Sequence, residues 1–241
     1  MTTLSKLIIA SILSLLVSSC KFDINLNSVR GNGDVTTVTR SINKNFNTIK
    51  VSRGLDVYIT QSNNESITVE ADDNLHDIII TEVENNVLKI YADENIRFSK
   101  SKKVMVSFKN ISKITATSGS DVISTNVIKA DDLELLTASG SDMKVEIETN
   151  SATCESSSGS DLRVSGKTNK LYAEASSGSD IKAGNLKALE TTARASSGAD
   201  ITLNTTKTLI AKASSGGDIN YYGNPEKVKK SDGVSGSIRK K

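Results

Sequence analysis

The sequence contains few aromatic residues: they make up 4% of its 241 residues, and tryptophan is absent. Histidine and proline each occur once, as His76 and Pro225. A single histidine excludes a site built from several histidines, whether catalytic or metal-binding. Lys and Arg total 30 against 28 Asp and Glu, a net charge of +2. Without a basic excess or stacking aromatics, the composition argues against nucleic acid as a partner.

The first 20 residues have the pattern of a secretion signal. Lys6 precedes an almost uninterrupted apolar stretch from Leu7 to Val17, shorter than the roughly 20 residues of a membrane-spanning helix. The stretch is followed by Ser18-Ser19-Cys20, and together with Val17 these residues resemble the lipobox of bacterial lipoproteins. The resemblance implies cleavage before Cys20 and lipid attachment to its thiol. An ordinary signal peptide with a chance cysteine is the alternative.

On this basis we predict a lipoprotein signal peptide over residues 1–19 and a short tether over 20–30. The mature chain would be exported and held by lipid in the cell envelope, at the outer membrane, on either its periplasmic or its surface face. If lipid occupies Cys20, the other cysteine, Cys154, has no disulfide partner. Its place in the repeat described next predicts a buried, inert thiol rather than a reactive one.

A short motif, Gly-x-Asp, recurs through most of the chain. Ser-Gly-Ser-Asp occurs four times between residues 118 and 180, and close variants surround Gly54, Gly198 and Gly216. From Gly119 onward the glycines are 21, 19, 19, 20 and 18 residues apart, and Gly236 lies 20 residues further on. Repetition at a near-constant spacing is typical of repeat architectures.

Apolar and polar residues alternate on both sides of each glycine. The positions five before and three after it are apolar in every copy, for example Cys154 and Leu162 around Gly159. The positions four before and four after are mostly polar, as with Glu155 and Arg163. This period of two predicts two strands joined by a glycine bend.

A unit of about 20 residues with one apolar face cannot bury that face alone. Stacking the units about 4.8 Å apart would bury a continuous column and pair every interior backbone group. We therefore predict an all-β fold, a parallel β-solenoid with about 20 residues per coil. A leucine-rich repeat has a similar period, but its Leu-x-x-Leu-x-Leu pattern and its Asn ladder are missing here.

Residues 60–112 interrupt the repeat. Strands are predicted at residues 67–71, 78–83, 88–91 and 104–108, with a hairpin turn at Glu84-Asn85-Asn86. We predict a strand meander that covers the N-terminal end of the solenoid, because uncovered strand edges recruit other chains. Regular coils are expected over 113–223. A terminal cap is expected over 224–241, with Ile238 at the position where earlier copies have Asp.

The repeated aspartates are the candidate site. If the coils stack in register, their carboxylates lie about 5 Å apart, which costs roughly 0.8 kcal/mol per neighbouring pair even in water. One interpretation is that each carboxylate accepts hydrogen bonds from bend N–H groups and serine hydroxyls. The other is that Ca²⁺ bridges the coils, as in shorter glycine-rich repeats. The ladder consists of Asp56, Asp121, Asp142, Asp161, Asp180, Asp200 and Asp218.

At this point the sequence resembles a family. The Ser-Gly-Ser-Asp repeats, Gly54-Leu55-Asp56-Val57, Tyr222-Gly223-Asn224-Pro225 and Gly236-Ser237-Ile238 are similar to the head GIN domain of putative auto-transporter adhesins, a domain of unknown function. The resemblance covers the predicted domain, residues 31–241. It implies a right-handed parallel β-helix, often in a lipoprotein, and it carries no active-site residues.

We therefore expect a lipid-anchored, monomeric adhesion, binding or scaffold module for an envelope or extracellular protein or glycan, without enzymatic activity, catalytic residues or a confident metal site. Columns of Lys144, Arg163 and Lys182 and of Glu155 and Glu174 are candidate contact stripes or serve solubility. The alternatives are a β-helix polysaccharide hydrolase or lyase and an envelope signalling or stress component. Interchangeable carboxylates and the absence of tryptophan argue against the enzyme. The acidic residues near His76, which are Asp72, Asp73, Asp77 and Asp93, are expected to form a solvated turn region.

Overall fold

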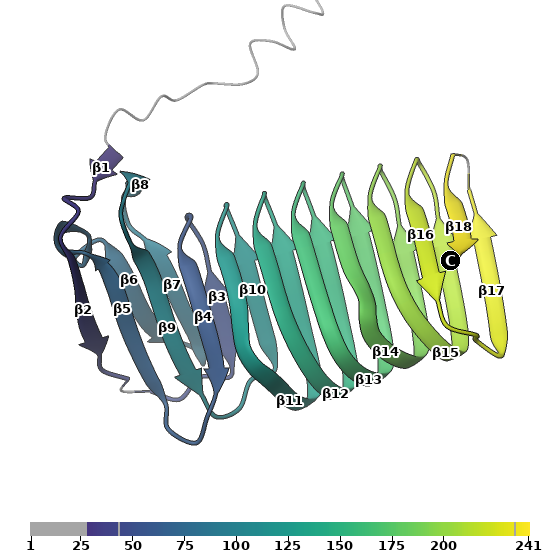
Figure 1. Cartoon of the computed structure of the whole chain (residues 1–241), viewed down its shortest axis with the longest axis horizontal. Helices are drawn as coiled ribbons and strands as arrows, with labels where there is room; N and C mark the ends of the chain where they lie inside the picture. The colour runs from purple at the N-terminus through teal and green to yellow at the C-terminus, as the bar shows by residue number, and fades with distance from the viewer. Residues whose placement is uncertain (1–27, 43, 234) are drawn as a thin grey trace, which may run out of the picture.

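The computed structural model describes residues 28–42, 44–233 and 235–241. Apart from one 3₁₀ turn, η1 (Asp73–Leu75), its elements are strands, and they stack side by side into a long flattened solenoid (Figure 1). The predicted all-β parallel β-solenoid is therefore confirmed. Within the described residues there is no helix of the length and apolarity needed to cross a membrane. The predicted signal peptide, Cys20 and most of the tether lie outside these residues.

Two parallel columns of strands form the body, and each coil contributes one strand that approaches the bend and one that leaves it. Both columns run through β11 to β15, whose later halves approach a bend and whose earlier halves leave one. These long strands are β11 (Asp121–Ala138), β12 (Asp142–Ser157), β13 (Asp161–Ser176), β14 (Asp180–Ala195) and β15 (Asp200–Ala213). The approaching column also contains β3 (Thr48–Val51), β10 (Lys113–Thr117) and β17 (Lys227–Asp232), and the leaving column β4 (Asp56–Gln61), β16 (Asp218–Tyr222) and β18 (Ser237–Lys240).

The core is the column of inward side chains predicted from the alternation. In the approaching column Leu135, Cys154 and Ala173 lie opposite one another in register, and each is fully buried. In the leaving column Met143 and Leu162 pair in the same way. In these coils small residues on one side and larger aliphatic residues on the other fill the interior. The buried aromatic residues lie toward the two ends of the stack, as with Phe108 in β9 (Lys102–Phe108) and Tyr221 in β16.

Coils of different length still keep their bends aligned. The register shifts of the long strands occur away from the bends: between Ile123 and Val127, between Arg163 and Ser165, between Ala183 and Lys187, and between Ala188 and Glu190. Extra residues are absorbed there as bulges, while the Asp positions stay opposite one another. The bends therefore stay in register from coil to coil, and differences in coil length are absorbed elsewhere.

The N-terminal end differs from the expected meander. β7 (Val87–Ala92) pairs in parallel with β3, and β9 (Lys102–Phe108) pairs in parallel with β4, so these two strands form a further coil. The antiparallel pairs of the described residues also lie here: β2 (Val35–Arg40) with β5 (Ser66–Asp72), β5 with β9, and β6 (Ile79–Glu84) with β7. Alternation predicts strands but not their direction of pairing, which explains the difference. A separate two-stranded sheet joins β1 (Ser28–Arg30) to β8 (Asn95–Phe98).

The C-terminal segment also continues the solenoid, because β17 pairs in parallel with β15 and β18 with β16. In this last coil Ser237, rather than Ile238, lies opposite Asp218. Ile238 is buried opposite Ile219. The expectation for Ile238 is therefore wrong by one residue, because its apolar side chain belongs to the inward column.

Candidate functional site: the aspartate ladder

Each bend is a tight turn whose two central residues have positive φ. At Ser158 and Gly159 the φ angles are 56° and 69°, and the Ser-Gly pairs of the other coils have similar values. Two successive positive φ values define a type I′ turn, which favours glycine. A Cβ on Gly159 would meet nothing within 4 Å, so glycine serves the backbone angle there rather than close packing. The N–H of Gly159 donates to the carbonyl of Ser177 in the next bend (3.1 Å), and this link repeats along the ridge.

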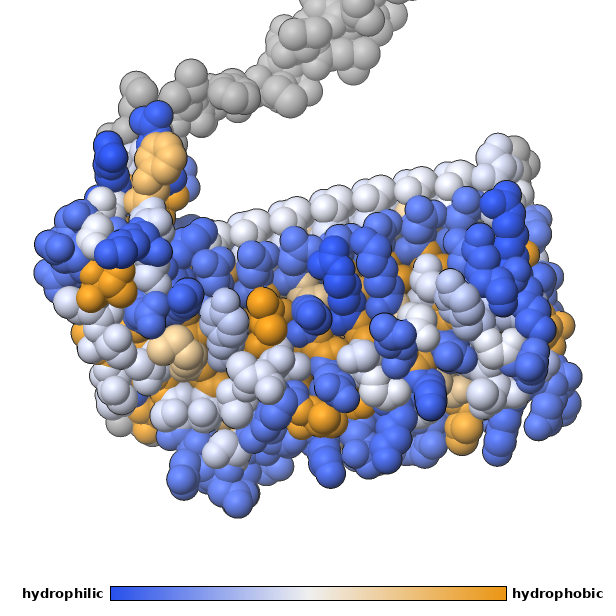
Figure 2. All heavy atoms as spheres, viewed as in Figure 1, coloured by the Kyte–Doolittle hydropathy of each residue, from blue (hydrophilic) through white to orange (hydrophobic). Residues whose placement is uncertain are grey.

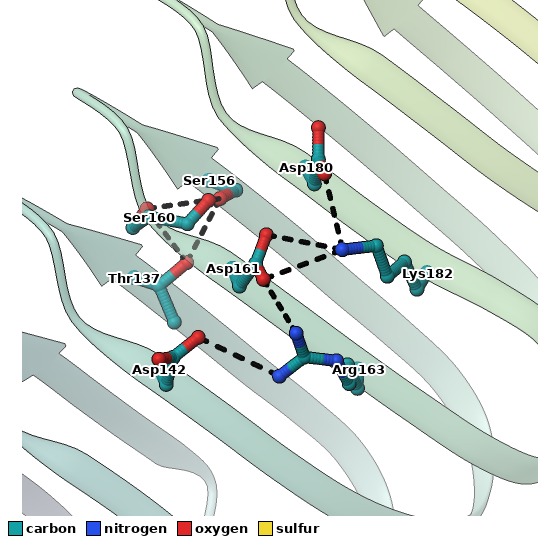
Figure 3. Close-up of polar contacts among 8 residues, drawn as sticks. All are labelled: Thr137, Asp142, Ser156, Ser160, Asp161, Arg163, Asp180 and Lys182. Atoms are coloured by element: carbon teal, nitrogen blue, oxygen red, sulfur yellow. Dashed lines mark hydrogen bonds and ion pairs between the residues drawn. The ribbon is translucent and has the colours of Figure 1, made fainter.

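The second serine of Ser-Gly-Ser-Asp closes the turn from inside. Ser160 is 1% exposed, and its hydroxyl donates to the Ser157 carbonyl (2.8 Å) and accepts from the Ser157 N–H (3.2 Å). It also contacts the buried hydroxyls of Thr137 (3.1 Å) and Ser156 (2.9 Å), which bond to each other at 3.0 Å (Figure 3). Ser120, Ser141 and Ser179 are buried in equivalent places.

The seven predicted aspartates do form one ladder. Each lies opposite the next in the sheet register, from Asp56 beside Asp121 through to Asp200 beside Asp218. Lys103 lies opposite the first member and Ser237 opposite the last. The Ser237 hydroxyl donates to Asp218 Oδ1 at 2.7 Å, so the ladder ends in a hydrogen bond.

Basic side chains two residues further along β13 and β14 neutralise the middle of the ladder (Figure 3). Arg163 Nη2 lies 2.5 Å from Asp161 Oδ2, and Arg163 Nη1 lies 3.5 Å from Asp142 Oδ1. Lys182 Nζ lies 3.3 Å from Asp161 Oδ2 and 3.1 Å from Asp180 Oδ2. Desolvation opposes the charge of Lys182, but its bonds to Asp180 and Asp161 outweigh this and raise its pKa. Consecutive carboxylates are thus joined by cations that the chain itself supplies.

Toward both ends the compensation is weaker. The residues two positions after Asp121 and Asp200 are Ile123 and Thr202. Burial and the carboxylates of Asp56 and Asp142 raise the pKa of Asp121, and Lys102 only partly offsets this. For Asp200 the same direction follows from burial and from its two neighbours in the ladder, Asp180 and Asp218.

The serine-hydroxyl part of the hydrogen-bonding interpretation is found at one member of the ladder, Asp218, which accepts from the Ser237 hydroxyl. Serine side chains, rather than aspartates, bond to the backbone of the bend, and the middle aspartates bond to Arg163 and Lys182. In the described residues no group of three or more His, Cys, Asp or Glu side chains is placed to hold a metal ion. In the middle coils a guanidinium and an ammonium group lie between consecutive carboxylates.

Asp72 does not lie in the solvated turn region predicted for it, because its carboxyl is buried. Asp72 is 1% exposed and accepts backbone hydrogen bonds from Gly33 (2.9 Å), Ser101 (2.9 Å) and Lys100 (3.0 Å). Burial raises the pKa of this carboxyl, but the three N–H donors outweigh that effect and lower it overall. His76, also buried, bonds to the Thr36 hydroxyl at 2.9 Å. The partners are distant in sequence, so the local pattern could not predict them.

Cys154 is fully buried, as its position in the repeat predicts. Burial raises the pKa of its thiol to about 12, so it is protonated and unreactive at neutral pH.

The fold and ladder define a class: a repetitive parallel β-solenoid whose described surface is built from regular side-chain columns. Residues 45–225 match the family described as putative auto-transporter adhesin, head GIN domain, and the chain belongs to that family. This confirms the resemblance carried by the repeats. Membership associates the chain with adhesins and with the cell envelope or surface.

Solved structures share the fold. A putative adhesin from Bacteroides fragilis superimposes with a TM-score of 0.82 at 23% identity, covering 89% of this chain and 100% of its own. A putative lipid binding protein from Parabacteroides distasonis has a TM-score of 0.72 at 23% identity and the same coverage of both chains. A putative adhesin from Parabacteroides merdae has a TM-score of 0.71 at 20% identity, covering 89% and 99%. No curated protein matches the sequence.

Proposed function

We propose that this protein is an exported, lipid-anchored binding module of the cell envelope, held through Cys20, which presents a stiff solenoid to a protein or glycan partner. The observation that carries the proposal is the parallel stacking of β11 to β15 with their bends aligned, which makes the body a rod with repeated polar columns. Membership in a family named for adhesion supports a binding role.

We propose further that the ladder is structural and not catalytic. Glycosidases need two carboxyl groups whose environments push their pKa values apart, so that one acts as an acid and the other as a base or nucleophile. Here Asp121 and Asp200 have pKa values raised in the same direction, and they lie in different coils at equivalent positions. The carboxylates between them are neutralised by Arg163 and Lys182. This arrangement favours binding over hydrolysis or elimination.

The anchor is tested by metabolic labelling with an alkyne fatty acid in a bacterium that processes lipoproteins. We expect the full chain to be labelled and Cys20→Ser to abolish labelling and release the protein from the membrane fraction. Cys154→Ala is the matched control, because it removes the other cysteine of the chain and should keep full labelling. Labelling that survives Cys20→Ser would overturn the anchor.

The binding role is tested with the anchored protein on intact cells. Protease accessibility assigns the membrane face, and cells or coated beads are then applied to immobilised mucin, extracellular-matrix proteins and cell-wall glycans. We expect retention on at least one of these and no release of reducing ends from soluble polysaccharides. Polysaccharide turnover that is lost in Asp161→Asn and Asp180→Asn would contradict the proposal and favour the enzyme.

A further inference from the structure

The most exposed large apolar side chain of the described residues is Phe98, which is 60% exposed. It ends β8 and lies opposite Arg30 of β1 in the small two-stranded sheet. Figure 1 places this β1–β8 ribbon at the end of the solenoid where the described chain begins, apart from the two main columns. The remaining exposed large apolar residues are 45% exposed or less.

Two arginines flank this ring. The guanidinium carbons of Arg97 and Arg30 lie 5.5 Å and 5.9 Å from its centroid, within the range of cation–π contacts. In Figure 2 the ribbon shows an apolar patch bordered by strongly hydrophilic residues. Basic and aromatic side chains combined on one small surface suit the headgroup region of a membrane, where rings enter the interface and cations meet anionic lipids.

The fold holds the ribbon in place. The N–H of Gly31 donates to the Phe98 carbonyl (2.7 Å), and the Asn74 amide donates to the Arg30 carbonyl (2.9 Å). Buried Asp72 bonds to the segment that follows β1, at Gly33, and to the segment that follows β8, at Ser101. These hydrogen bonds fix the backbone of the ribbon, so the exposed ring does not belong to a frayed chain end.

The position of the ribbon along the chain also points to a membrane. β1 begins at Ser28, eight residues after Cys20. Eight residues span at most about 26–29 Å. A lipid on Cys20 would therefore keep the ribbon within that distance of the bilayer. Asp93 and Glu94, the acidic residues directly before β8, line a hollow that the ribbon shares through Asn95 and Ile96, and Arg53 and Lys102 line the same hollow and balance their charge.

We propose that the β1–β8 ribbon is a membrane-contact surface: Phe98 enters the lipid interface and Arg30 and Arg97 bind anionic phospholipid headgroups, which orients the solenoid on the bilayer. The inference rests on the proposed lipid anchor, because a single ring and two arginines bind weakly unless a tether raises their effective concentration. It adds a second, non-covalent membrane contact to that anchor.

The absence of tryptophan makes a direct test available. A chain spanning residues 20–241 contains every described residue, and relatives covered over their full crystallised length show that this body is a self-contained fold. Cys20 is coupled to a maleimide phospholipid in vesicles of phosphatidylcholine with phosphatidylglycerol; buried Cys154 does not react. Phe98→Trp reports on the ribbon, and Tyr222→Trp, at a residue 43% exposed in β16, is the matched control.

We expect the emission of the Phe98→Trp protein to shift to the blue and to be quenched by brominated lipid, and that of Tyr222→Trp to do neither. Replacing Arg30 and Arg97 by Gln in the Phe98→Trp protein should weaken contact about fivefold per arginine. Lys227→Gln with Lys229→Gln, two exposed cations of β17, should leave it unchanged. Vesicles without phosphatidylglycerol should also lose the signal.

Equal quenching of the two tryptophan reporters, or none at Phe98→Trp, would overturn the proposal. Because the coupling to lipid is chemical, this outcome does not depend on acylation in cells. Loss of labelling in Cys20→Ser tests the anchor separately, so the two failures are distinguishable. Thermal melts of each variant show that a lost signal does not reflect unfolding.

Discussion

The middle coils of the solenoid and its outer coils differ in how the negative charge of the aspartate ladder is compensated. Around Asp161 the ladder is joined by Arg163 and Lys182, and the bend beneath it is filled by bonded hydroxyls. Around Asp200 the outward position is Thr202, and the inward bend position is Ala199. Equivalent backbone positions thus have compensated charge and a bonded polar interior around Asp161, and carboxylate repulsion over an apolar interior around Asp200.

The largest difference should come from the bend serine. We expect Ser160→Ala to lower the free energy of unfolding by about 1–3 kcal/mol, because it removes bonds to Ser157, Thr137 and Ser156 at a fully buried site. In the outer coil, Ala199→Ser adds the hydroxyl that Ser160 already has and should change stability by less than about 1 kcal/mol. Urea titration measures both. Equal losses in the two variants would remove the distinction between the regions.

Neutralising one aspartate in each region should give effects of opposite sign. Asp161→Asn breaks two partly exposed ion pairs and should cost about 1 kcal/mol or less. Asp200→Asn removes repulsion from Asp180 and Asp218 and should stabilise by a similar amount. Melting temperatures should therefore move in opposite directions by about 1–3 °C at low salt. A shift of the same sign in both variants would contradict the compensation argument.

Acid should act on the outer coils first. The folded-state pKa values of Asp121 and Asp200 are raised above 3.8, so the folded chain binds these protons more tightly than the unfolded chain. Their contribution to stability therefore increases as pH falls from 7 through the raised pKa values. Asp72 has a lowered pKa, so its contribution is lost only as pH falls below 3.8. The gain should disappear in the Asp121→Asn, Asp200→Asn double variant, followed by melts across pH 7 to 4.

The smallest effect should come from transferring the middle arrangement outward. Thr202→Lys places an ammonium group two residues after Asp200, as Lys182 follows Asp180. We expect a stabilisation of about 0.5 kcal/mol that is lost in 1 M salt, because a partly exposed pair is screened. Thr202→Met, of similar length and uncharged, is the control. A gain that persists in high salt would indicate packing rather than charge.

The alternation around each glycine predicted the coil, the inward column and the in-register aspartates, because period-2 patterning and a fixed repeat leave one way to bury the apolar face. The Gly-x-Asp motif predicted the wrong alignment for the last coil, because it matches Gly236 to Gly216. In the structure Gly236 corresponds to Gly217, and the inward side chains of Ile238 and Ile219 lie opposite each other. The inward position of Ile238 was the signal that could have corrected it.

Contacts between distant segments could not be predicted in this way. β7 and β9 follow β3 and β4 in sequence but lie outside them in the stack, which depends on pairing energies along whole strands. The bonds of Asp72 to Gly33 and Ser101 join segments 39 and 29 residues away. No local pattern distinguishes this buried carboxylate from its exposed neighbour Asp73.

By itself the sequence determined the solenoid, its period, its glycine bends and the placement of the carboxylates on one face. These are local properties repeated many times, so each copy reinforces the others. Tertiary structure alone decided which carboxylates of the ladder are neutralised and that Asp72 is buried. It also decided where Phe98, the most exposed aromatic ring of the described residues, lies on the surface. Those outcomes depend on side chains brought together by stacking and on backbone donors from remote segments.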